Sequence, residues 1–178
     1  MGLDNVQLHI VDSAEKASDF IHWLQERRPT LGVDTETGGF TFFRDGLRLI
    51  QFGDPYTGWA LPYQDWRGLC REAFQIVHEA KDVPLIFHNA PFDIKFILHN
   101  GLTPKDSHGN HLWPWERTMD TMTLAGMVFP SGSRALKNLS AQLIDARAAS
   151  AQKHLASTMA DNKWTWATVP EYHDPYWA

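Results

Sequence analysis

The sequence of 178 residues contains a single cysteine, Cys70, so no disulfide bond can form within the chain. This excludes the disulfide framework on which many small secreted domains depend. No stretch of 18 apolar residues occurs, and the first ten residues include an aspartate and no long apolar run, so neither a membrane span nor an export signal is visible. We therefore expect a soluble, intracellular protein that does not contact a membrane.

An excess of positive charge is also lacking, because 16 basic side chains face 21 acidic ones and the formal net charge is −5. Proteins that hold nucleic acids through bulk charge usually carry a basic face or tail. A nucleic-acid ligand of this chain would therefore have to be attracted by a local site. Eight tryptophans and ten phenylalanines supply aromatic surface, which serves either a core or base stacking.

The pattern of apolar residues predicts one α/β domain over residues 1–178. Strands are expected at 6–11, 31–35, 47–53, 59–61 and 83–87, the middle three forming an antiparallel meander. Helices are expected at 14–27, 66–79, 91–100, 121–129 and 135–149, with Ser13, Asn89 and Asp120 in capping positions. Residues 101–117 have no apolar period and are expected to form a long surface loop.

Two carboxylates, Asp34 and Glu36, lie two residues apart at the end of an apolar strand, so the pleat turns both to one face. Like charges this close repel unless a cation or a proton lies between them. Oxygen ligands without a nearby histidine or thiol favour a hard ion such as Mg²⁺ or Mn²⁺. The alternative is a pair of solvated acids at a strand end before a glycine turn.

A third acid, Asp93, falls in the first turn of the helix that follows the apolar strand at 83–87. Taken alone, it is better explained as a carboxylate stabilised by a helix N-terminus. The ends of two neighbouring strands, however, would bring Asp34, Glu36 and Asp93 into one cleft, which is where open α/β sheets bind ligands.

These residues resemble the motifs of the 3′–5′ proofreading exonuclease domain of family A DNA polymerases, part of the DEDD superfamily that includes ribonuclease D. Its first motif, Asp-x-Glu, matches Asp34 and Glu36, and its second matches Asn89, Phe92 and Asp93. The resemblance spans about residues 6–178 and extends to two later helices, at Asp120-Thr121-Met122 and Leu136-Lys137-Asn138-Leu139. It implies a ribonuclease H-like α/β fold, a central mixed sheet with helices on both faces.

The resemblance also implies an activity, the stepwise release of nucleoside monophosphates from a 3′ end with the help of two Mg²⁺ or Mn²⁺ ions. By this likeness Asp34 bridges both ions, Glu36 serves the ion on the nucleophile side, and Asp93 holds the second ion. The expected substrate is a single-stranded DNA 3′ end, RNA remaining an alternative, and a DNA polymerase chain is an expected partner. A phage or bacterial origin would place the protein in the cytoplasm of a bacterial cell or a phage-infected host.

The candidate nucleic-acid contacts come from three parts of the chain. Asn89 and Phe92 belong to the second motif, Phe40 follows the first motif, and Lys137 and Asn138 lie in the later helix. Phe40 could stack on a terminal base or fold back into the core. Scattered basic residues such as Arg48 and Lys95 could meet phosphates, although solvated surface is the usual role of such residues.

The third motif of the family, Tyr-x-x-x-Asp or His-x-x-x-x-Asp, is absent from its expected place, so the site is one carboxylate short. The chain is expected to end just before that motif. A split or truncated exonuclease, substitution by Glu171 or Asp174, and a catalytically inactive module that binds a polymerase chain or a nucleic-acid end are the three explanations. We favour incompleteness over substitution, since neither acid has the matching tyrosine or histidine, and expect weak or no activity from the isolated chain.

Overall fold

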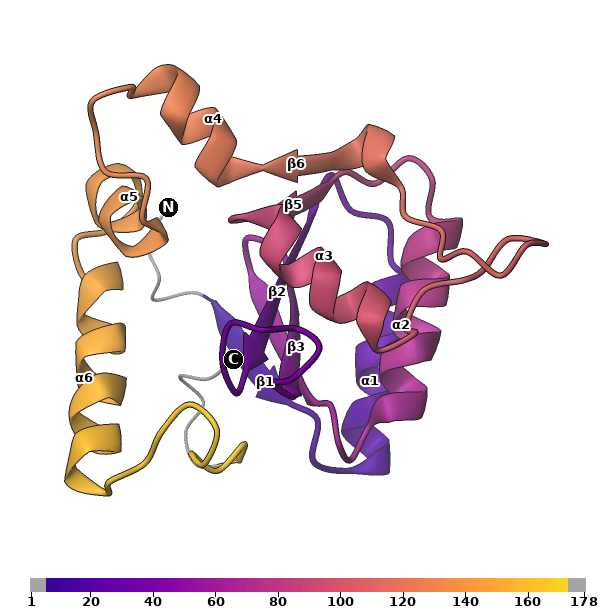
Figure 1. Cartoon of the computed structure of the whole chain (residues 1–178), viewed down its shortest axis with the longest axis horizontal. Helices are drawn as coiled ribbons and strands as arrows, with labels where there is room; N and C mark the ends of the chain where they lie inside the picture. Colours follow the sequence, from indigo (N-terminus) through magenta and orange to yellow (C-terminus); the bar gives the residue numbers. More distant parts are fainter. Residues whose placement is uncertain (1–5, 173–178) are drawn as a thin grey trace.

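A six-stranded mixed sheet forms the centre of the protein, whose structure, a computed structural model, describes residues 6–172 and their side chains except those of 148–154 (Figure 1). The strands are β1 (Gln7–Ile10), β2 (Leu31–Thr37), β3 (Leu47–Gly53), β4 (Thr57–Pro62), β5 (Leu85–Phe87) and β6 (Thr118–Asp120). Their order is β1-β4-β3-β2-β5-β6. Strands β2, β3 and β4 form the expected antiparallel meander, whereas β1, β5 and β6 join the sheet through parallel pairs.

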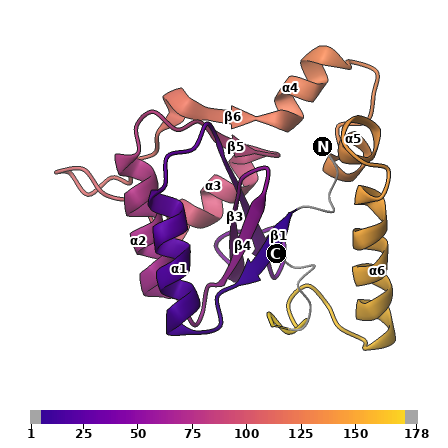
Figure 2. The same ribbon diagram turned by 180° about the vertical axis from the view of Figure 1, so that it is seen from behind.

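Helices cover both faces of this sheet, as Figure 2 shows from behind. They are α1 (Ala14–Gln25), α2 (Arg67–Glu79), α3 (Ala90–His99), α4 (Thr121–Val128), α5 (Leu136–Leu143) and α6 (Ala148–Asp161). The main core contains the apolar side chains of α1, α2 and α3, among them Phe20, Phe74 and Phe96. Each of these three rings is almost fully buried, so this face carries most of the apolar burial that stabilises the fold.

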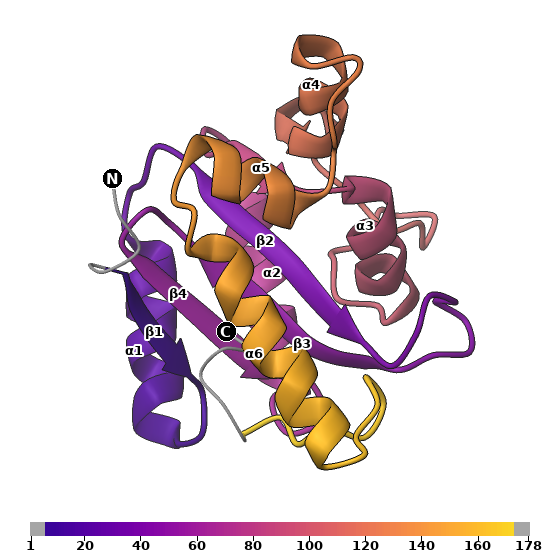
Figure 3. The same cartoon turned by 90° about the vertical axis from the view of Figure 1, so that its left-hand side faces the viewer.

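A second, smaller cluster lies on the opposite face of the sheet. Leu49 of β3 packs there with Leu155 and Met159 of α6 and with Val169, and Trp164 borders the cluster. Figure 3 shows α6 in front of the sheet on this side, over β3. Val169, eight residues after the end of α6, is therefore back against the sheet.

Two of the expected elements are corrected by the structure. The predicted helix at 135–149 is two helices, α5 and α6, because the α5 helix ends at Leu143 and Ile144 closes it with a hydrogen bond to Ser140. The region 101–117 is only partly a surface loop, since Leu102 and Trp113 are buried in the main core. This region leads into β6, a strand of three residues that is too short to show an alternating pattern in the sequence.

Among the residues that the structure describes, no helix has the length and apolar character needed to cross a membrane.

Candidate active site

The acids Asp34 and Glu36 lie on one face of the central strand β2, as the pleat predicts. In the antiparallel ladder Asp34 is opposite Gln51 and Glu36 is opposite Leu49. Side chains of directly opposed residues share a face, so the two acids are on the side of the sheet that α6 covers. We call this side the acid face.

Asp93 reaches β2 along the edge that β5 leaves open. Strand β5 pairs with β2 only at Leu31 and Gly32 and ends at Phe87, so beyond this point β2 has no strand partner on that edge. Asp93 Oδ1 accepts hydrogen bonds from Thr35 N (3.0 Å) and from Thr35 Oγ1 (2.6 Å). The carboxylate thus satisfies a buried backbone N–H and is held beside the peptide that links the two other acids.

The three carboxylates raise one another's pKa. Burial raises the pKa of Asp34 to about 7, with a further contribution from the charge of Glu36. Burial and the charge of Asp93 raise the pKa of Glu36 to about 7, against the opposing effect of Arg48. The pKa of Asp93 also rises to about 7 through burial and the charge of Asp34, although the Thr35 hydrogen bonds favour its ionised form. The structure therefore brings all three predicted acids into one mutually repelling cluster.

A divalent cation fits the chemistry of this donor set, because carboxylate oxygens are the ligands that Mg²⁺ and Mn²⁺ prefer. A bound cation would also offset the burial and the mutual repulsion that raise the three pKa values. Within residues 6–172, however, no three histidine, cysteine, aspartate or glutamate side chains are arranged closely enough to form a ready cage. The acids are thus close enough to interact electrostatically but would have to draw together around an ion.

Asn89 occupies the expected position at the start of α3 but does not cap it with its side chain. Its backbone is left-handed, with φ 72°, and no side-chain hydrogen bond to the helix is present. The Asn89 N–H instead donates to Asp120 Oδ1 (2.9 Å), which also accepts from Met122 N (2.9 Å) at the start of α4. Asp120 thus has the structural capping role predicted for it and also fixes the turn that leads to Asp93.

An aromatic pocket of about 350 Å³ adjoins the turn that leads into α3. Phe40 is 90% exposed, so it does not fold back into the core, and its ring meets that of Phe92 edge-on at 6.2 Å. Phe42 instead packs against the main core and the ring of His99. The pocket is lined by Phe40, Thr41, Phe42, Phe43, Asn89, Pro91, Phe92, Lys95 and Phe96.

Lys137 and Asn138 are placed apart from this pocket. Both are exposed on α5, and neither lines the pocket. Asn138 Nδ2 donates to Ser133 Oγ (2.7 Å), an interaction that organises the turn before α5. The structure therefore brings Asn89, Phe92 and Phe40 together but does not add the two later residues to the group.

Of the two acids considered as substitutes for the missing carboxylate, Glu171 is engaged elsewhere and Asp174 lies outside the described residues. Glu171 Oε1 accepts from Arg48 Nη2 at 2.6 Å. Thr35 and Arg48 are the contributors that sequence reasoning missed, one as the anchor of Asp93 and the other as the cation that acts on Glu36. No local sequence signal marks either role, since both depend on partners distant in the chain.

Comparison with known proteins identifies relatives over nearly the whole chain. The model of a family described as 3′–5′ exonuclease matches residues 8–170. A DNA polymerase of Mycobacterium phage D29 is 31% identical over 188 residues, and the match covers 97% of this chain and 30% of the phage protein. The chain therefore spans about 30% of the length of this relative.

Solved structures share the fold at low sequence identity. The ribonuclease D:GMP complex of Trypanosoma brucei superposes with a TM-score of 0.64 at 11% identity, over 94% of this chain and 52% of that one. The EXO domain of Nibbler from Aedes aegypti gives a TM-score of 0.56 at 18% identity, over 100% of this chain and 83% of that one. The fold is thus the ribonuclease H-like fold of exonucleases. Together with the match over residues 8–170, this means that the chain belongs to the 3′–5′ exonuclease family of family A DNA polymerases.

Proposed function

We propose that this chain is a metal-dependent exonuclease that removes nucleoside monophosphates from the 3′ ends of single-stranded DNA. The observation that carries the proposal is that Asp93 is hydrogen-bonded to Thr35, the residue between Asp34 and Glu36, so that the three acids act on one another's charge. Buried acids that raise one another's pKa are costly to the fold unless a bound cation compensates them, and such clusters concentrate at functional sites. Membership of the 3′–5′ exonuclease family supports the reaction and its direction.

Asp34, Glu36 and Asp93 would hold two Mg²⁺ or Mn²⁺ ions. When bound, these ions supply an activated water and stabilise the departing oxygen of the phosphodiester. The chain's own contribution is to orient the three carboxylates. Strand β2 fixes two of them on one face, and Thr35 holds Asp93 Oδ1 with two hydrogen bonds. Metal binding would also convert a site that repels phosphate into one that attracts it.

The aromatic pocket would receive the end of the nucleic acid. Phe40 presents an exposed ring, and stacking of one base on such a ring is worth about 1–3 kcal/mol. Lys95 lies on α3 and lines the same pocket, where its ammonium group would meet a backbone phosphate. Stacking is tolerant of sequence, so we expect little preference among the four bases.

A polymerase is the partner that this proposal implies. The phage relative is named DNA polymerase, and the chain corresponds to 30% of its length. We propose that the exonuclease acts with a polymerase chain, removing nucleotides at the 3′ end from which synthesis proceeds. We also expect it to act inside the cell, where that substrate is found.

The proposal is tested with the isolated chain, Mn²⁺ and a 5′-labelled single-stranded deoxyoligonucleotide. Calorimetric titration is expected to detect Mn²⁺ binding that Asp34→Ala abolishes. Products that shorten one nucleotide at a time from the 3′ end would establish the direction, and an RNA oligonucleotide of the same sequence tests the substrate. We expect weak digestion because the third-motif carboxylate is absent from the sequence. Failure of the wild-type protein to bind Mn²⁺ would contradict the proposal.

A second candidate is a non-catalytic module of the same fold that binds a polymerase chain or a nucleic-acid end. It is favoured by the missing third motif and by the lack of a ready three-ligand cage within residues 6–172. This module would bind the oligonucleotide equally well with and without Mn²⁺ and would leave it intact. The exonuclease, by contrast, should bind it more tightly when Mn²⁺ or Ca²⁺ is present.

A further inference from the structure

Arg48 lies at an irregularity of strand β3 that changes the direction of its side chain. In the β2–β3 ladder Glu36 is opposite Leu49 and Thr37 is opposite Leu47, so the register shifts by one residue at Arg48. Leu47 belongs to the main core and Leu49 to the cluster under α6, on the other face. A β-bulge of this kind re-aims the extra residue, and here the Arg48 guanidinium meets the residues that follow α6.

The Arg48 guanidinium holds the segment of residues 164–172 through four hydrogen bonds. Nη1 donates to the carbonyl oxygen of Trp166 (2.6 Å) and Nη2 to that of Val169 (2.5 Å). Nε and Nη2 both donate to Glu171 Oε1, at 3.0 and 2.6 Å. A planar guanidinium is suited to this forked arrangement, which a lysine ammonium cannot reproduce.

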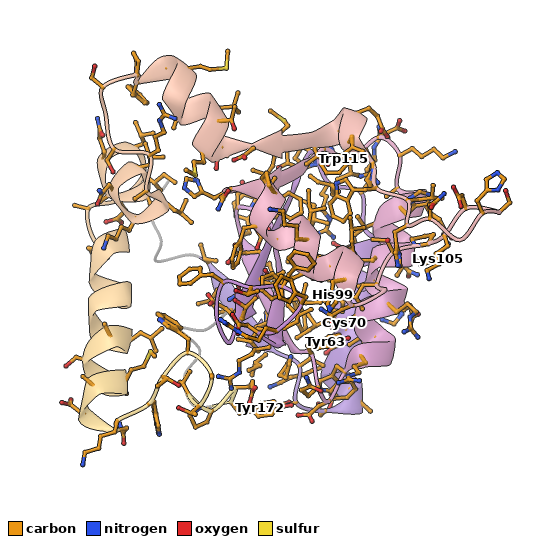
Figure 4. The ribbon with its side chains drawn as sticks, in the orientation of Figure 1. Tyr63, Cys70, His99, Lys105, Trp115 and Tyr172 are labelled. Carbon is orange, nitrogen blue, oxygen red and sulfur yellow. The ribbon has the colours of Figure 1, made fainter. Side chains whose placement is uncertain are left out.

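The 164–172 segment is also packed against the sheet on either side of this contact. Val169 is fully buried in the cluster around Leu49. A β-carbon placed on Gly38 would lie 3.6 Å from the Cβ of Ala167, so the segment passes close to the turn that follows Glu36. Tyr172, labelled in Figure 4 below the sheet, donates its hydroxyl to Asp65 Oδ2 at 2.7 Å.

We propose that Arg48 is a positioning residue that fixes the 164–172 segment as a wall of the candidate active site. This inference rests on the proposed exonuclease function, because the wall matters to activity only if the neighbouring acids are the site. Its observations are separate, namely the bulge, the four hydrogen bonds and the packing of Val169. The wall would limit the positions that a nucleic-acid end can adopt beside Glu36. This acid lies two residues before Gly38, which the wall approaches.

Hydrogen–deuterium exchange of the metal-free protein tests the docking of the wall. Arg48→Met is expected to accelerate exchange in residues 164–172 by about tenfold or more, with α1 unchanged. Arg48→Lys should give a smaller acceleration, and Glu171→Gln one smaller still, because the contacts to the two carbonyl oxygens remain. Arg71→Met removes the same charge from the exposed side of α2 and serves as the control. Unchanged exchange in folded Arg48→Met would overturn the inference.

Binding of a fluorescein-labelled deoxythymidine oligonucleotide in CaCl₂ then tests positioning. If the wall positions the DNA strand, Arg48→Met should weaken oligonucleotide binding by about tenfold, because small displacements near a site have large effects on the interactions made there. Arg48→Lys should restore part of the affinity. Faster exchange with unchanged affinity would reduce Arg48 to a purely structural role and contradict the proposal. A wild-type protein that binds no oligonucleotide contradicts the exonuclease function instead, and the exchange experiment still decides whether Arg48 docks the wall.

Discussion

The first residue of strand β2 and the turn that follows the strand line two different cavities. The first residue, Leu31, lines a cavity of about 1030 Å³ together with residues from the ends of α1 and α2. The acids Asp34 and Glu36 lie further along the strand, and Phe40 of the turn that follows it lines the aromatic pocket of about 350 Å³ at the start of α3. None of the three acids lines either of these two cavities.

The two ends differ in how their charges are compensated. In the large cavity, Arg28 donates to Asp54 and to the carbonyl oxygen of Glu26 and lies 3.8 Å from the centre of the Trp23 ring, while Arg117 donates to the Val83 carbonyl oxygen. At the other end Asp34, Glu36 and Asp93 repel one another. Charges such as those of Arg28 and Asp54 have their partners within the fold, whereas strongly perturbed ionisable groups concentrate at functional sites. The candidate site is therefore marked by the repulsion among its acids and not by either cavity.

The largest effect on the protein is expected from removing Arg28, whose charge is already paired within the fold. Arg28→Met removes the cation that pairs with Asp54 and stacks on Trp23, and we expect the free energy of unfolding to fall by about 3 kcal/mol. Urea denaturation measures this change. Arg27→Met, an exposed neighbour lining the same cavity, should change stability by less than about 0.5 kcal/mol. Equal effects of the two substitutions would show that Arg28 is not structural.

The second largest effect is expected for Mn²⁺ affinity when one of the three acids is neutralised. Asp34→Asn keeps the size of the side chain but removes its charge, so we expect the affinity for Mn²⁺ to fall by about 100-fold in a calorimetric titration. Asp82→Asn removes an exposed acid from the large cavity and should leave Mn²⁺ affinity within about twofold. Similar losses in both variants would mean that Mn²⁺ responds to net charge and not to a site.

The pH dependence of stability follows from the same repulsion. The pKa values of Asp34, Glu36 and Asp93 are raised to about 7, so between their ordinary values and pH 7 the folded protein binds more protons than the unfolded chain. Their contribution to stability is present at low pH and is lost as the pH rises through 7. One pKa unit is worth about 1.4 kcal/mol, so we expect the loss to exceed that figure.

Urea denaturation in EDTA from pH 5 to 8 measures this loss. The window lies above the range in which Asp106 and Asp120 titrate, since hydrogen bonds lower the pKa of both groups. Asp93→Asn retains an oxygen that can accept from Thr35 and removes one charge, so it should flatten the profile, and Mn²⁺ should restore stability at pH 8. An Asp93→Asn profile that matches the wild-type profile would contradict the predicted repulsion among the three acids.

Local patterns in the sequence predicted the features that depend on neighbouring residues. Helix α1 begins after Ser13, whose side chain accepts from Lys16 N as an N-cap does, and the period-two spacing of Asp34 and Glu36 determines their shared face. The position of Asp93 followed from the way parallel strands end at one edge of a sheet. The first two inferences needed no knowledge of distant contacts, whereas the third rested on the expectation that two strands end side by side.

Features that depend on distant contacts escaped sequence reasoning. The β-bulge at Arg48 is visible only in the pairing of two strands, and its guanidinium binds residues more than one hundred positions away in the chain. Asn89 has the residue type of a helix cap, but its side chain makes no hydrogen bond to the helix. Its backbone N–H donates to Asp120, at the end of a later strand. The break between α5 and α6 leaves Lys137 and Asn138 on a short helix away from the aromatic pocket.

The smallest effect is expected for two exposed aromatic residues, one in the aromatic pocket and one near the large cavity. Phe40 is 90% exposed, so Phe40→Ala should change the free energy of unfolding by less than about 0.5 kcal/mol. If its ring stacks on a base, the same substitution weakens binding of single-stranded DNA by about 1 kcal/mol, which fluorescence anisotropy can measure. Trp115 is 61% exposed beside the start of β6, two residues from Arg117 of the large cavity, and Trp115→Ala should leave binding unchanged. Equal losses in the two variants would indicate that aromatic surface attracts DNA wherever it is exposed, and the aromatic pocket would then have no special role.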